Sequence, residues 1–386
     1  MRLKKKRKLA FIRSSFGSRG IIMNFETIVE HFQFEGHLQE VIPYGSGHIN
    51  TTYLVVFSLP DQRQRRYILQ KMNSGIFHNC AQLMENIANV TAFLRKKIIA
   101  DSGDPERETV NIIPTTDGKT FYHSDVDGDW RAYIFIEDAK TYNMVQTPED
   151  FYQTAVAFGH FQYLLSDYPV DTLYETIPNF HHTPTRFEQF LNAVKMDCYG
   201  RTAKVQSEID FVMQRKEDTH ILTDLLAQNQ IPLRVTHNDT KLNNIMIDDT
   251  TRKAICVIDL DTVMPGLSVY DFGDSIRFGA STAQEDETDL SKVHLDLQLF
   301  EQYTKGFLQG CQGSLTQIEL DMLPMGAKII TLECGMRFLT DYLEGDHYFK
   351  IHREGHNLDR ARTQFKLVED MESKYHQMQQ IVKLSQ

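Results

Sequence analysis

The segment Val235–Asp261 constrains the fold more than any other part of the chain. Two short apolar runs, 245–247 and 255–258, flank the polar, turn-forming stretch Asp248–Lys253. Apolar β-branched runs on either side of such a turn predict a β-hairpin over residues 245–258. A further apolar run and a polar loop precede it. The segment therefore predicts a strand, a loop and a hairpin in close succession.

This hairpin brings three oxygen-bearing side chains together. Taken symmetrically, it pairs Ile245 with Ile258, so that Asn244 lies opposite Asp259 at the open end. Asp239 lies five residues before Asn244, on the loop that leads in. Phosphoryl transfer needs such a set, because one Asp accepts the proton of the substrate hydroxyl, while an Asn and a second Asp hold Mg²⁺ ions on the nucleotide phosphates. Hard oxygen ligands suit Mg²⁺.

The rest of the chain divides into a β-rich part and a larger helical part. Strands are predicted at 38–43, 52–59, 66–72 and 130–136, with one helix at 80–99. Long helices are predicted at 148–166, 184–196, 202–229, 293–309 and 316–344. The change from strands to helices falls near Glu137–Tyr142, and the predicted fold class is α+β.

The charge distribution argues against a nucleic-acid partner. The formal net charge is −11, and eight of the 41 Lys and Arg residues lie in the first 20 positions, which hold no acidic residue. Residues 21–386 thus carry 33 basic against 52 acidic side chains, whereas a nucleic-acid binder shows a basic face. No apolar run approaches the roughly 18 residues of a membrane span. Five widely spaced cysteines exclude a disulfide framework and fit a reducing cytosol, so we expect a cytoplasmic protein. We also expect a monomer.

The first 22 residues are strongly basic. Their only apolar stretch, Leu9–Ile12, is cut short by Arg13 and is too short for a signal peptide. We expect a disordered tail over residues 1–22, with Met23 as a candidate start of the native protein.

The pattern H-x-D-x₄-N, followed by I-D and Y-D, resembles the aminoglycoside phosphotransferase and choline kinase superfamily. In this chain it reads HNDTKLNNIMID, VIDLDTV and YDFGD. The resemblance implies that Asp239 is the catalytic base and that Asn244 and Asp259 bind the metal. It also implies that His237 and Asp271 brace the loop.

The same resemblance implies a two-lobed, protein-kinase-like fold with ATP in the cleft. The small β-rich N-lobe, which binds the nucleotide, would span residues 23–139. The large, mostly helical C-lobe would span residues 140–386 and hold the catalytic loop, the metal site and the acceptor site.

A glycine turn is the first candidate for nucleotide binding. The turn Tyr44–Thr51 lies between two predicted strands, and Gly45, Ser46, Gly47 and Asn50 in it form a GxGxxN pattern. Glycines let the backbone N–H groups approach phosphates.

A cation for the α- and β-phosphates is expected on the third strand, paired with a helical Glu. The strand offers Gln70 and Lys71, and the helix offers Glu85. Because strand residues alternate between faces, only one of Gln70 and Lys71 faces the nucleotide. We favour Lys71, although the superfamily pattern aligns as well with Gln70. Lys241 is placed like the lysine that steadies the γ-phosphate in many kinases.

The predicted helix Lys328–Leu343 is apolar on one side and carries Glu333, Arg337 and Asp341 at successive i, i+4 positions beside it. Such a ladder is usually a solvated face with weak ion pairs. The next segment, GDHYFKIHREGHNLDRARTQF, is dense in Tyr, His, Asn and Arg. These side chains supply directional hydrogen bonds to sugar hydroxyls.

Segments along nearly the whole chain after Met23 resemble the N-acetylhexosamine 1-kinase branch. They are QKMN, LMENI, WRAYIFIEDAKTY, IPNFHHTP, VMPG…YDFGDSIR and GMRFLTDYLEGDHYF. Members of this branch phosphorylate the anomeric hydroxyl of GlcNAc or GalNAc with ATP and Mg²⁺ in a cytoplasmic salvage route. The resemblance implies that Glu333, Arg337 and Tyr348 contact the sugar.

Three alternatives stay open. The first keeps the chemistry and replaces the acceptor with choline, an amino acid or an aminoglycoside, although Arg337 favours a neutral polyol. The second is a catalytically dead kinase-like binding module, against which the intact Asp239, Asn244 and Asp259 argue. The third is a metal-dependent hydrolase that uses the aspartates at 259, 261, 271 and 274.

Overall fold

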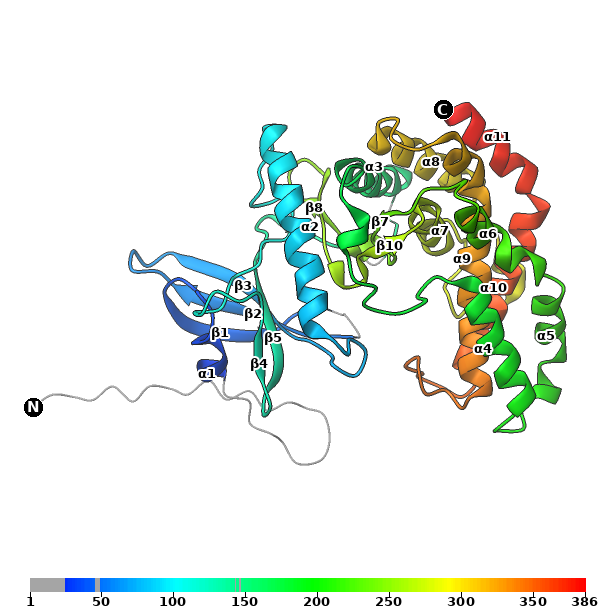
Figure 1. The fold of residues 1–386 in the computed structure, drawn as a ribbon, viewed down its shortest axis with the longest axis horizontal. Helices are drawn as coiled ribbons and strands as arrows, with labels where there is room; N and C mark the ends of the chain where they lie inside the picture. Colours follow the sequence, from blue (N-terminus) through cyan, green and yellow to red (C-terminus); the bar gives the residue numbers. More distant parts are fainter. Residues whose placement is uncertain (1–24, 46–48, 143, 146) are drawn as a thin grey trace, which may run out of the picture. The chain divides into compact units, whose positions relative to one another are not determined.

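A computed structural model describes residues 25–45, 49–142, 144–145 and 147–386. The chain divides into two compact units, the small unit Met1–Glu137 and the large unit Asp138–Gln386 (Figure 1). Strands dominate the small unit and helices dominate the large one, which confirms the predicted α+β class. Residues 1–22, for which a disordered tail is predicted, lie outside the described residues.

The small unit is built on a five-stranded antiparallel sheet with the order β1-β2-β3-β5-β4. Its elements are α1 (Phe25–Val29), β1 (His37–Pro43), β2 (Thr51–Ser58), β3 (Gln64–Lys71), α2 (Cys80–Ala100), β4 (Tyr122–Ser124) and β5 (Gly128–Ile134). The four predicted strands and the predicted helix are therefore present, and their ends differ from the prediction by at most two residues.

The two faces of this sheet have different partners. Because successive strand residues point to opposite faces, Trp130 and Arg131 of β5 lie on different sides. On one side, Phe25 of α1 packs against Tyr53 and Trp130, with ring centroids 4.7 and 6.2 Å away. On the other side, the Arg131 guanidinium reaches Met84 of α2, with Nη1 3.9 Å from Sδ. Helices α1 and α2 therefore contact opposite faces.

The large unit surrounds two small sheets with helices. Its strands are β6 (Ala139–Lys140), β7 (Arg234–Thr236), β8 (Ile245–Asp248), β9 (Ala254–Val257) and β10 (Met264–Gly266). Its α-helices are α3 (Pro148–Leu164), α4 (Thr183–Met196), α5 (Gln206–Met213), α6 (Ile221–Ala227), α7 (Ser268–Gly279), α8 (Leu297–Cys311), α9 (Gln317–Leu343), α10 (His356–Ser373) and α11 (Tyr375–Ser385). One sheet has the order β6-β8-β9, and the other pairs β7 with β10.

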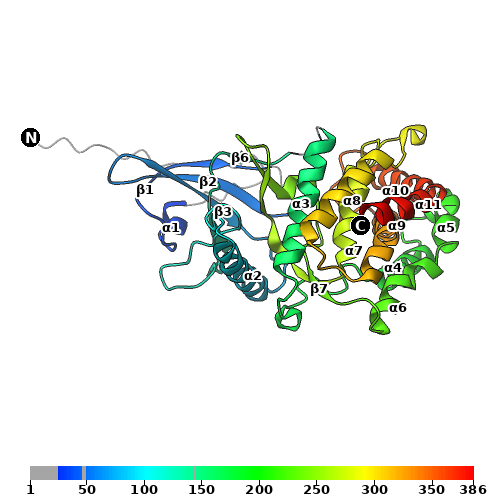
Figure 2. The ribbon, with the colours of Figure 1, turned by 90° about the horizontal axis from the view of Figure 1, so that it is seen from above.

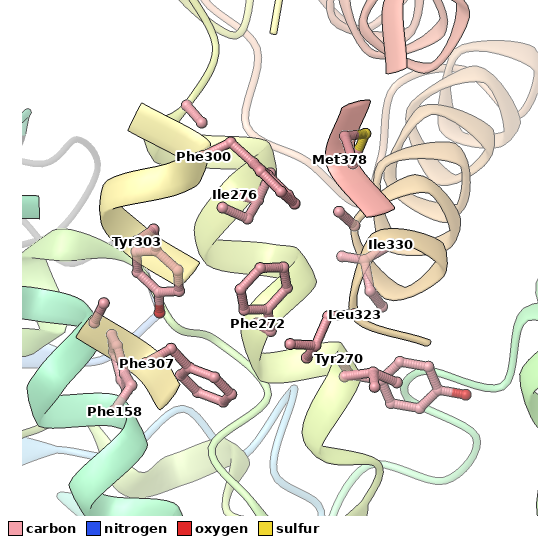
Figure 3. Close-up of a cluster of buried hydrophobic side chains, with 14 of the residues drawn as sticks. Phe158, Tyr270, Phe272, Ile276, Phe300, Tyr303, Phe307, Leu323, Ile330 and Met378 are labelled. Carbon is pink, nitrogen blue, oxygen red and sulfur yellow. The ribbon is translucent and has the colours of Figure 1, made fainter. Parts of the chain in front are cut away.

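Helix α7 lies inside the main core of the large unit and is buried along nearly its whole length. Figure 3 shows Phe272 of α7 among the side chains of this core. Its ring lies 5.5–5.8 Å from the rings of Phe300, Tyr303 and Phe307 on α8. Leu323 of α9 belongs to the same cluster. The core therefore fixes α7 firmly between α8 and α9.

Helices α7 and α9 touch at backbone distance because both carry a glycine at the contact. A Cβ atom at Gly273 would lie 2.4 Å from the carbonyl oxygen of Gly326. A Cβ atom at Gly326 would lie 2.3 Å from the carbonyl oxygen of Val269. Since any side chain there would clash with backbone, the two glycines set the spacing of the helices.

The single predicted helix over 202–229 is wrong. The structure has the separate helices α5 and α6 in this region (Figure 2). The segment between the two helices makes long-range contacts, since Arg215 pairs with Glu372 of α10 at 2.6 Å. Asp218 also pairs with Lys328 of α9 at 2.8 Å. These tertiary pairs override the local helical pattern.

No helix in the described part of the chain combines the length and the hydropathy needed to cross a bilayer.

Candidate active site

The loop between β7 and β8 is anchored by its histidine. His237 is fully buried, with the rings of Phe158 and Phe161 of α3 at 5.6 and 6.1 Å. Its Nε2 donates to the carbonyl oxygen of Ile258 (2.9 Å), and its Nδ1 accepts the backbone N–H of Asp239 (3.3 Å). The ring therefore joins the loop to the end of the hairpin and orients the backbone of Asp239.

Two carboxylates of α7 hold the backbone of the same loop. Asp271 accepts the backbone N–H groups of His237 (2.9 Å) and Asn238 (2.8 Å). Asp274 accepts the backbone N–H of Thr240 (3.0 Å). Burial raises the pKa of Asp271, and the N–H donors stabilise its charged form. The position of the loop is thus set by α7, which the core holds in place.

Asp239 lies between an amide and an ammonium group. Asn244 Nδ2 donates to the carbonyl oxygen of Asp239 (2.8 Å) and to its Oδ2 (3.3 Å), and Lys241 Nζ lies 2.7 Å from its Oδ1. Burial alone would raise the pKa of this carboxyl, but the charge and hydrogen bond of Lys241 outweigh burial and hold the pKa below its usual value. Its side chain is 28% exposed, so an ionised carboxylate is accessible to a ligand.

The hairpin register differs from the predicted one by a residue. In the observed register Ile245 pairs with Val257, and a β-bulge lies between Met246 and Ile247. The N–H of Ile258 donates to the Asn244 carbonyl (2.9 Å), so Asn244 does not lie opposite Asp259. A bulge adds an unpaired residue to one strand, and the symmetric pairing assumed from the sequence could not anticipate it.

Asp259 directly follows Ile258 and has a left-handed backbone conformation, with φ 60° and ψ 58°. Asp tolerates this region better than most residues do. The amide nitrogen of Asn244 is engaged by Asp239, while no contact within the described residues uses its Oδ1. That oxygen and the Asp259 carboxylate are ligands of the kind that Mg²⁺ prefers.

A larger metal cluster is not part of this arrangement. Within residues 25–45, 49–142, 144–145 and 147–386, no group of three or more His, Cys, Asp or Glu is placed to hold a metal ion. His352 and His356 contact each other, and His356 also meets Asp286 at 3.0 Å.

Arg277 of α7 belongs to the site although the sequence analysis does not single it out. It is 6% exposed and pairs with Asp274 at 2.9 Å and Glu285 at 2.8 Å. Its charge adds to the low pKa of Asp239. The i, i+3 spacing of Asp274 and Arg277 was the available signal.

The glycine turn is described only in part. Ser46 and Gly47 lie outside the described residues. Gly45 has a φ of 78°, which favours glycine. The side chain of Asn50 accepts the backbone N–H of Asn73 (3.0 Å) and so links the turn to the end of β3.

Gln70 and Lys71 lie on opposite faces of the small sheet. Gln70 is paired with Arg131 and accepts a hydrogen bond from its Nε (2.9 Å), on the side of α2. Lys71 lies beside the Trp130 ring, with Nζ 5.9 Å from the centroid, on the side of α1. Lys71 therefore does not face the helix that offers Glu85, and which of the two residues faces a nucleotide stays a prediction. Glu85 itself is exposed on α2.

Glu333 of α9 is buried among polar partners. Its Oε1 lies 2.8 Å from Nδ1 of His181, and its Oε2 accepts the hydroxyl of Thr183 (2.7 Å). The other ring nitrogen of His181 donates to the carbonyl of Asn238 (3.1 Å). Both ring nitrogens of His181 therefore face oxygen atoms. The pair ties α9 to the loop that carries Asp239.

Arg337 and Tyr348 lie close together beside a second arginine. Arg337 Nη2 is 3.4 Å from the Tyr348 hydroxyl, and its guanidinium lies 5.4 Å from the Phe180 ring. Arg186 donates to the Phe180 carbonyl (3.0 Å). Burial, and after it the charge of Arg337, lowers the pKa of Arg186. Both arginines thus contact Phe180, Arg337 at its ring and Arg186 at its carbonyl.

Asp341 does not pair with Arg337. Its carboxylate accepts the three consecutive backbone N–H groups of residues 347–349 at 2.8–2.9 Å and so holds the segment after α9. The ladder of Glu333, Arg337 and Asp341 is thus not a row of surface ion pairs, since both carboxylates are buried and bound elsewhere.

A model of the phosphotransferase enzyme family matches residues 40–304, more than half of the chain. The aminoglycoside phosphotransferase from Alicyclobacillus acidocaldarius subsp. acidocaldarius DSM 446 is 12% identical, with a TM-score of 0.61 over 96% of this chain and 99% of that one. The microcompartment-associated aminopropanol kinase is 13% identical, with a TM-score of 0.54 over 92% and 97%. The choline kinase from Cryptosporidium parvum Iowa II is 15% identical, with a TM-score of 0.52 over 90% and 92%. These likenesses confirm the expected kinase-like fold.

Proposed function

The chain belongs to the phosphotransferase enzyme family, and on that basis we propose that it transfers the γ-phosphoryl group of ATP to the anomeric hydroxyl of an N-acetylhexosamine, GlcNAc or GalNAc. One observation in particular supports phosphoryl transfer. Asp239 is an accessible, ionised carboxylate set between Lys241 and Asn244. The backbone around it is fixed by His237 and Asp271. Catalysis that rests on positioning needs this rigidity.

In the proposed reaction, Asp239 accepts a hydrogen bond from the acceptor hydroxyl and takes its proton as the oxygen attacks the γ-phosphorus. The new bond joins the acceptor oxygen to phosphorus, the bond from phosphorus to the β–γ bridging oxygen breaks, and ADP leaves. Because its pKa is lowered, Asp239 is a weak base and contributes mainly by orienting the hydroxyl. Lys241 offsets negative charge on the group in transfer.

Asn244 and Asp259 would hold Mg²⁺, which when bound neutralises charge on the nucleotide phosphates. The donor set fits this ion, because it offers an amide oxygen and a carboxylate and lacks thiolates.

The surroundings of Arg337 support an uncharged acceptor that is rich in hydroxyl and amide groups. Arg337 and Arg186 supply N–H donors, and Tyr348 adds a hydroxyl. Glu333 is buried and already bound to His181 and Thr183, so it does not face a cationic acceptor. In this proposal Glu333 acts indirectly, by fixing His181.

The alternatives meet specific obstacles. The names of the aminopropanol kinase and the choline kinase suggest amine-bearing acceptors, which two adjacent guanidinium groups would repel. A catalytically dead module does not need the contacts around Asp239. A hydrolase using Asp271 and Asp274 is opposed by their hydrogen bonds to the loop backbone.

The test is a screen of Mg²⁺-dependent ATP consumption with GlcNAc, GalNAc, glucose, glucosamine, choline and an aminoglycoside. We expect turnover with GlcNAc or GalNAc and a product whose phosphate is released by mild acid, as anomeric phosphates are. Turnover of choline or the aminoglycoside alone would keep the phosphotransferase and remove the hexosamine. A protein that neither binds ATP nor phosphorylates any acceptor would refute the proposal.

A further inference from the structure

The peptide group that joins Asn238 to Asp239 is held at both of its polar ends. Its N–H, which belongs to Asp239, donates to Nδ1 of His237 (3.3 Å). Its carbonyl oxygen, which belongs to Asn238, accepts a hydrogen bond from Nε2 of His181 (3.1 Å). Because a peptide group is planar, these two contacts fix the rotation of the plane, and with it the direction in which the Asp239 side chain leaves the backbone.

Asn238 is fixed on the other side of this peptide group as well. Its backbone is left-handed, with a φ of 64°, which Asn tolerates better than most residues do. Its side chain donates to the carbonyl oxygen of Thr262 (2.8 Å) and accepts the hydroxyl of Thr236 (2.9 Å). Its own N–H is bound by Asp271 (2.8 Å). The contact with His181 completes this set, because it occupies the remaining polar group of Asn238.

His181 reaches the loop from a distant part of the chain, two residues before α4 begins. Its ring centroid lies 4.6 Å from that of Phe180 and 5.5 Å from that of Tyr270. Its Nδ1 lies 2.8 Å from Glu333 of α9, and its side chain is only 8% exposed. The packing and the carboxylate therefore hold the imidazole in one orientation, with Nε2 directed at the carbonyl oxygen of Asn238.

The segment that carries His181 also meets the residues that are proposed to contact the sugar. Phe180 directly precedes His181, and its ring lies 5.4 Å from the guanidinium of Arg337. The carbonyl oxygen of Phe180 accepts a hydrogen bond from Arg186 (3.0 Å). Two adjacent residues thus contact the proposed acceptor side and the loop of the proposed base.

We propose that His181 is a positioning residue, which acts through the Asn238 carbonyl to align the Asp239 carboxylate with the acceptor hydroxyl. His181 does not itself touch the reacting atoms. Catalysis that rests on positioning is sensitive to small displacements of the reacting groups, so a contact that fixes the direction of Asp239 affects kcat. This inference deepens the proposed function and rests on it.

Two substitutions of His181 separate its two contacts. In asparagine the amide nitrogen lies as many bonds from Cα as Nδ1 does in histidine, so His181→Asn keeps a donor for Glu333 and loses the one for Asn238. In glutamine the amide nitrogen lies as many bonds from Cα as Nε2 does, so His181→Gln keeps the donor for Asn238. We expect His181→Asn to lower kcat about 10- to 100-fold, the effect of a small misplacement, and His181→Gln to lower it much less. The KM values of ATP and of the acceptor should be nearly unchanged in both.

Steady-state kinetics of the full-length protein provide the comparison, with an acceptor that the wild type phosphorylates. His181→Asn is also made in the Asp239→Asn background, where it should have little further effect, because residues that act as a unit are not additive. The control is His376→Phe, which changes an exposed histidine of α11 and should leave kcat and both KM values unchanged.

A loss of kcat that is as large in His181→Gln as in His181→Asn, or larger, overturns the inference, because it would show that His181 serves Glu333 or the packing alone. An equal loss from His181→Asn with and without the Asp239 carboxylate overturns it as well. If His181→Asn does not fold, His181→Gln decides the question, since its smaller loss must then disappear in the Asp239→Asn background.

The acceptor for these measurements comes from the screen, so a failure of the hexosamine proposal is distinguishable from a failure of this inference. A wild type that phosphorylates no acceptor removes the proposed function and this inference together.

Discussion

The carboxylate of Asp239 shows how much a single residue depends on its neighbours. An ammonium lies 2.7 Å from one of its oxygens and an amide 3.3 Å from the other. Arg277, which does not touch it, adds to the same electrostatic effect. The site is therefore built to keep one negative charge in a fixed position, and each of the following substitutions changes one part of it.

Replacing Asp239 with Asn keeps the size of the side chain and removes its charge. We expect kcat to fall at least ~10²-fold, the effect of losing a positioned proton acceptor. ATP affinity should be nearly retained. Steady-state kinetics and calorimetry measure the two quantities. Wild-type turnover by this variant would show that Asp239 is not the base.

Asp259→Asn removes the proposed metal ligand while keeping a residue that tolerates the left-handed backbone. We expect Mg²⁺-dependent ATP binding and turnover to be lost, as measured by titration with and without Mg²⁺. The control is Asp249→Asn, which changes a surface carboxylate paired with Lys140 in the turn of the same hairpin. Unchanged affinity for MgATP in Asp259→Asn would exclude the residue as a ligand.

Arg337→Ala should raise the KM of GlcNAc or GalNAc at least about tenfold and leave the KM of ATP unchanged, because only donors to the acceptor are removed. Tyr348→Phe should have a smaller effect on the same parameter, since one hydroxyl is lost. Arg362→Ala, which removes an arginine paired with Glu208, is the control. A lower melting temperature with unchanged KM values would make Arg337 a structural residue.

The sequence identifies those candidate site residues that share one short segment. Asp239, Asn244 and His237 have fixed spacings along the loop, so a local pattern reveals them. His181 and Arg186 escape detection because their site partners are distant in the chain; the contact between His181 and Glu333 spans 152 positions. Side-chain chemistry alone does not indicate such pairs.

At the scale of elements, the contact between α7 and α9 links two parts of the site. Helix α7 carries Asp271, which holds the catalytic loop, and α9 carries Glu333, whose partner His181 binds the same loop. Gly273 and Gly326 allow these helices to touch. A change in the spacing of the two helices would therefore displace Asp271 and Glu333 at the same time.

Gly326→Ala should destabilise the protein by about 1–3 kcal/mol, the usual effect of overpacking a core. The added methyl would lie 2.3 Å from a backbone oxygen, so the helices must separate. We also expect a lower kcat. Denaturant unfolding and kinetics test both effects. Gly75→Ala is the control, because only a flexible Asn73 side-chain atom lies near its Cβ position, and a similar loss in both variants would contradict this explanation.

Elements with strong local patterns are predicted well, and those shaped by distant contacts are not. Four of the five strands of the small sheet and helix α2 follow from alternation and from the apolar stripe, while the three-residue strand β4 is not predicted. The break between α5 and α6 depends on Arg215 and its pairing with Glu372. The hairpin offset depends on a bulge. Neither leaves a local signal in the sequence.

At the scale of the whole molecule, the acidic character belongs to residues 21–386, with 52 acidic and 33 basic side chains. The two units have separate hydrophobic clusters within the described residues. The basic residues near the start of the chain show no apolar periodicity that would add to either cluster.

Deletion of residues 1–22 should therefore leave the melting temperature and the phosphotransferase activity unchanged within error. Thermal unfolding and the ATP consumption assay provide the comparison with the full chain. A decrease of several degrees would contradict this expectation and assign a packing role to these residues.

The residues proposed to contact the sugar all lie in one unit, and this has a consequence for how the sugar binds. Asp239, Arg186 and Arg337 all belong to the large unit. The proposed sugar contacts are therefore complete in the enzyme before the nucleotide arrives. We therefore expect that the sugar binds in the absence of ATP, and that an unreactive sugar analogue competes with the sugar at every ATP concentration.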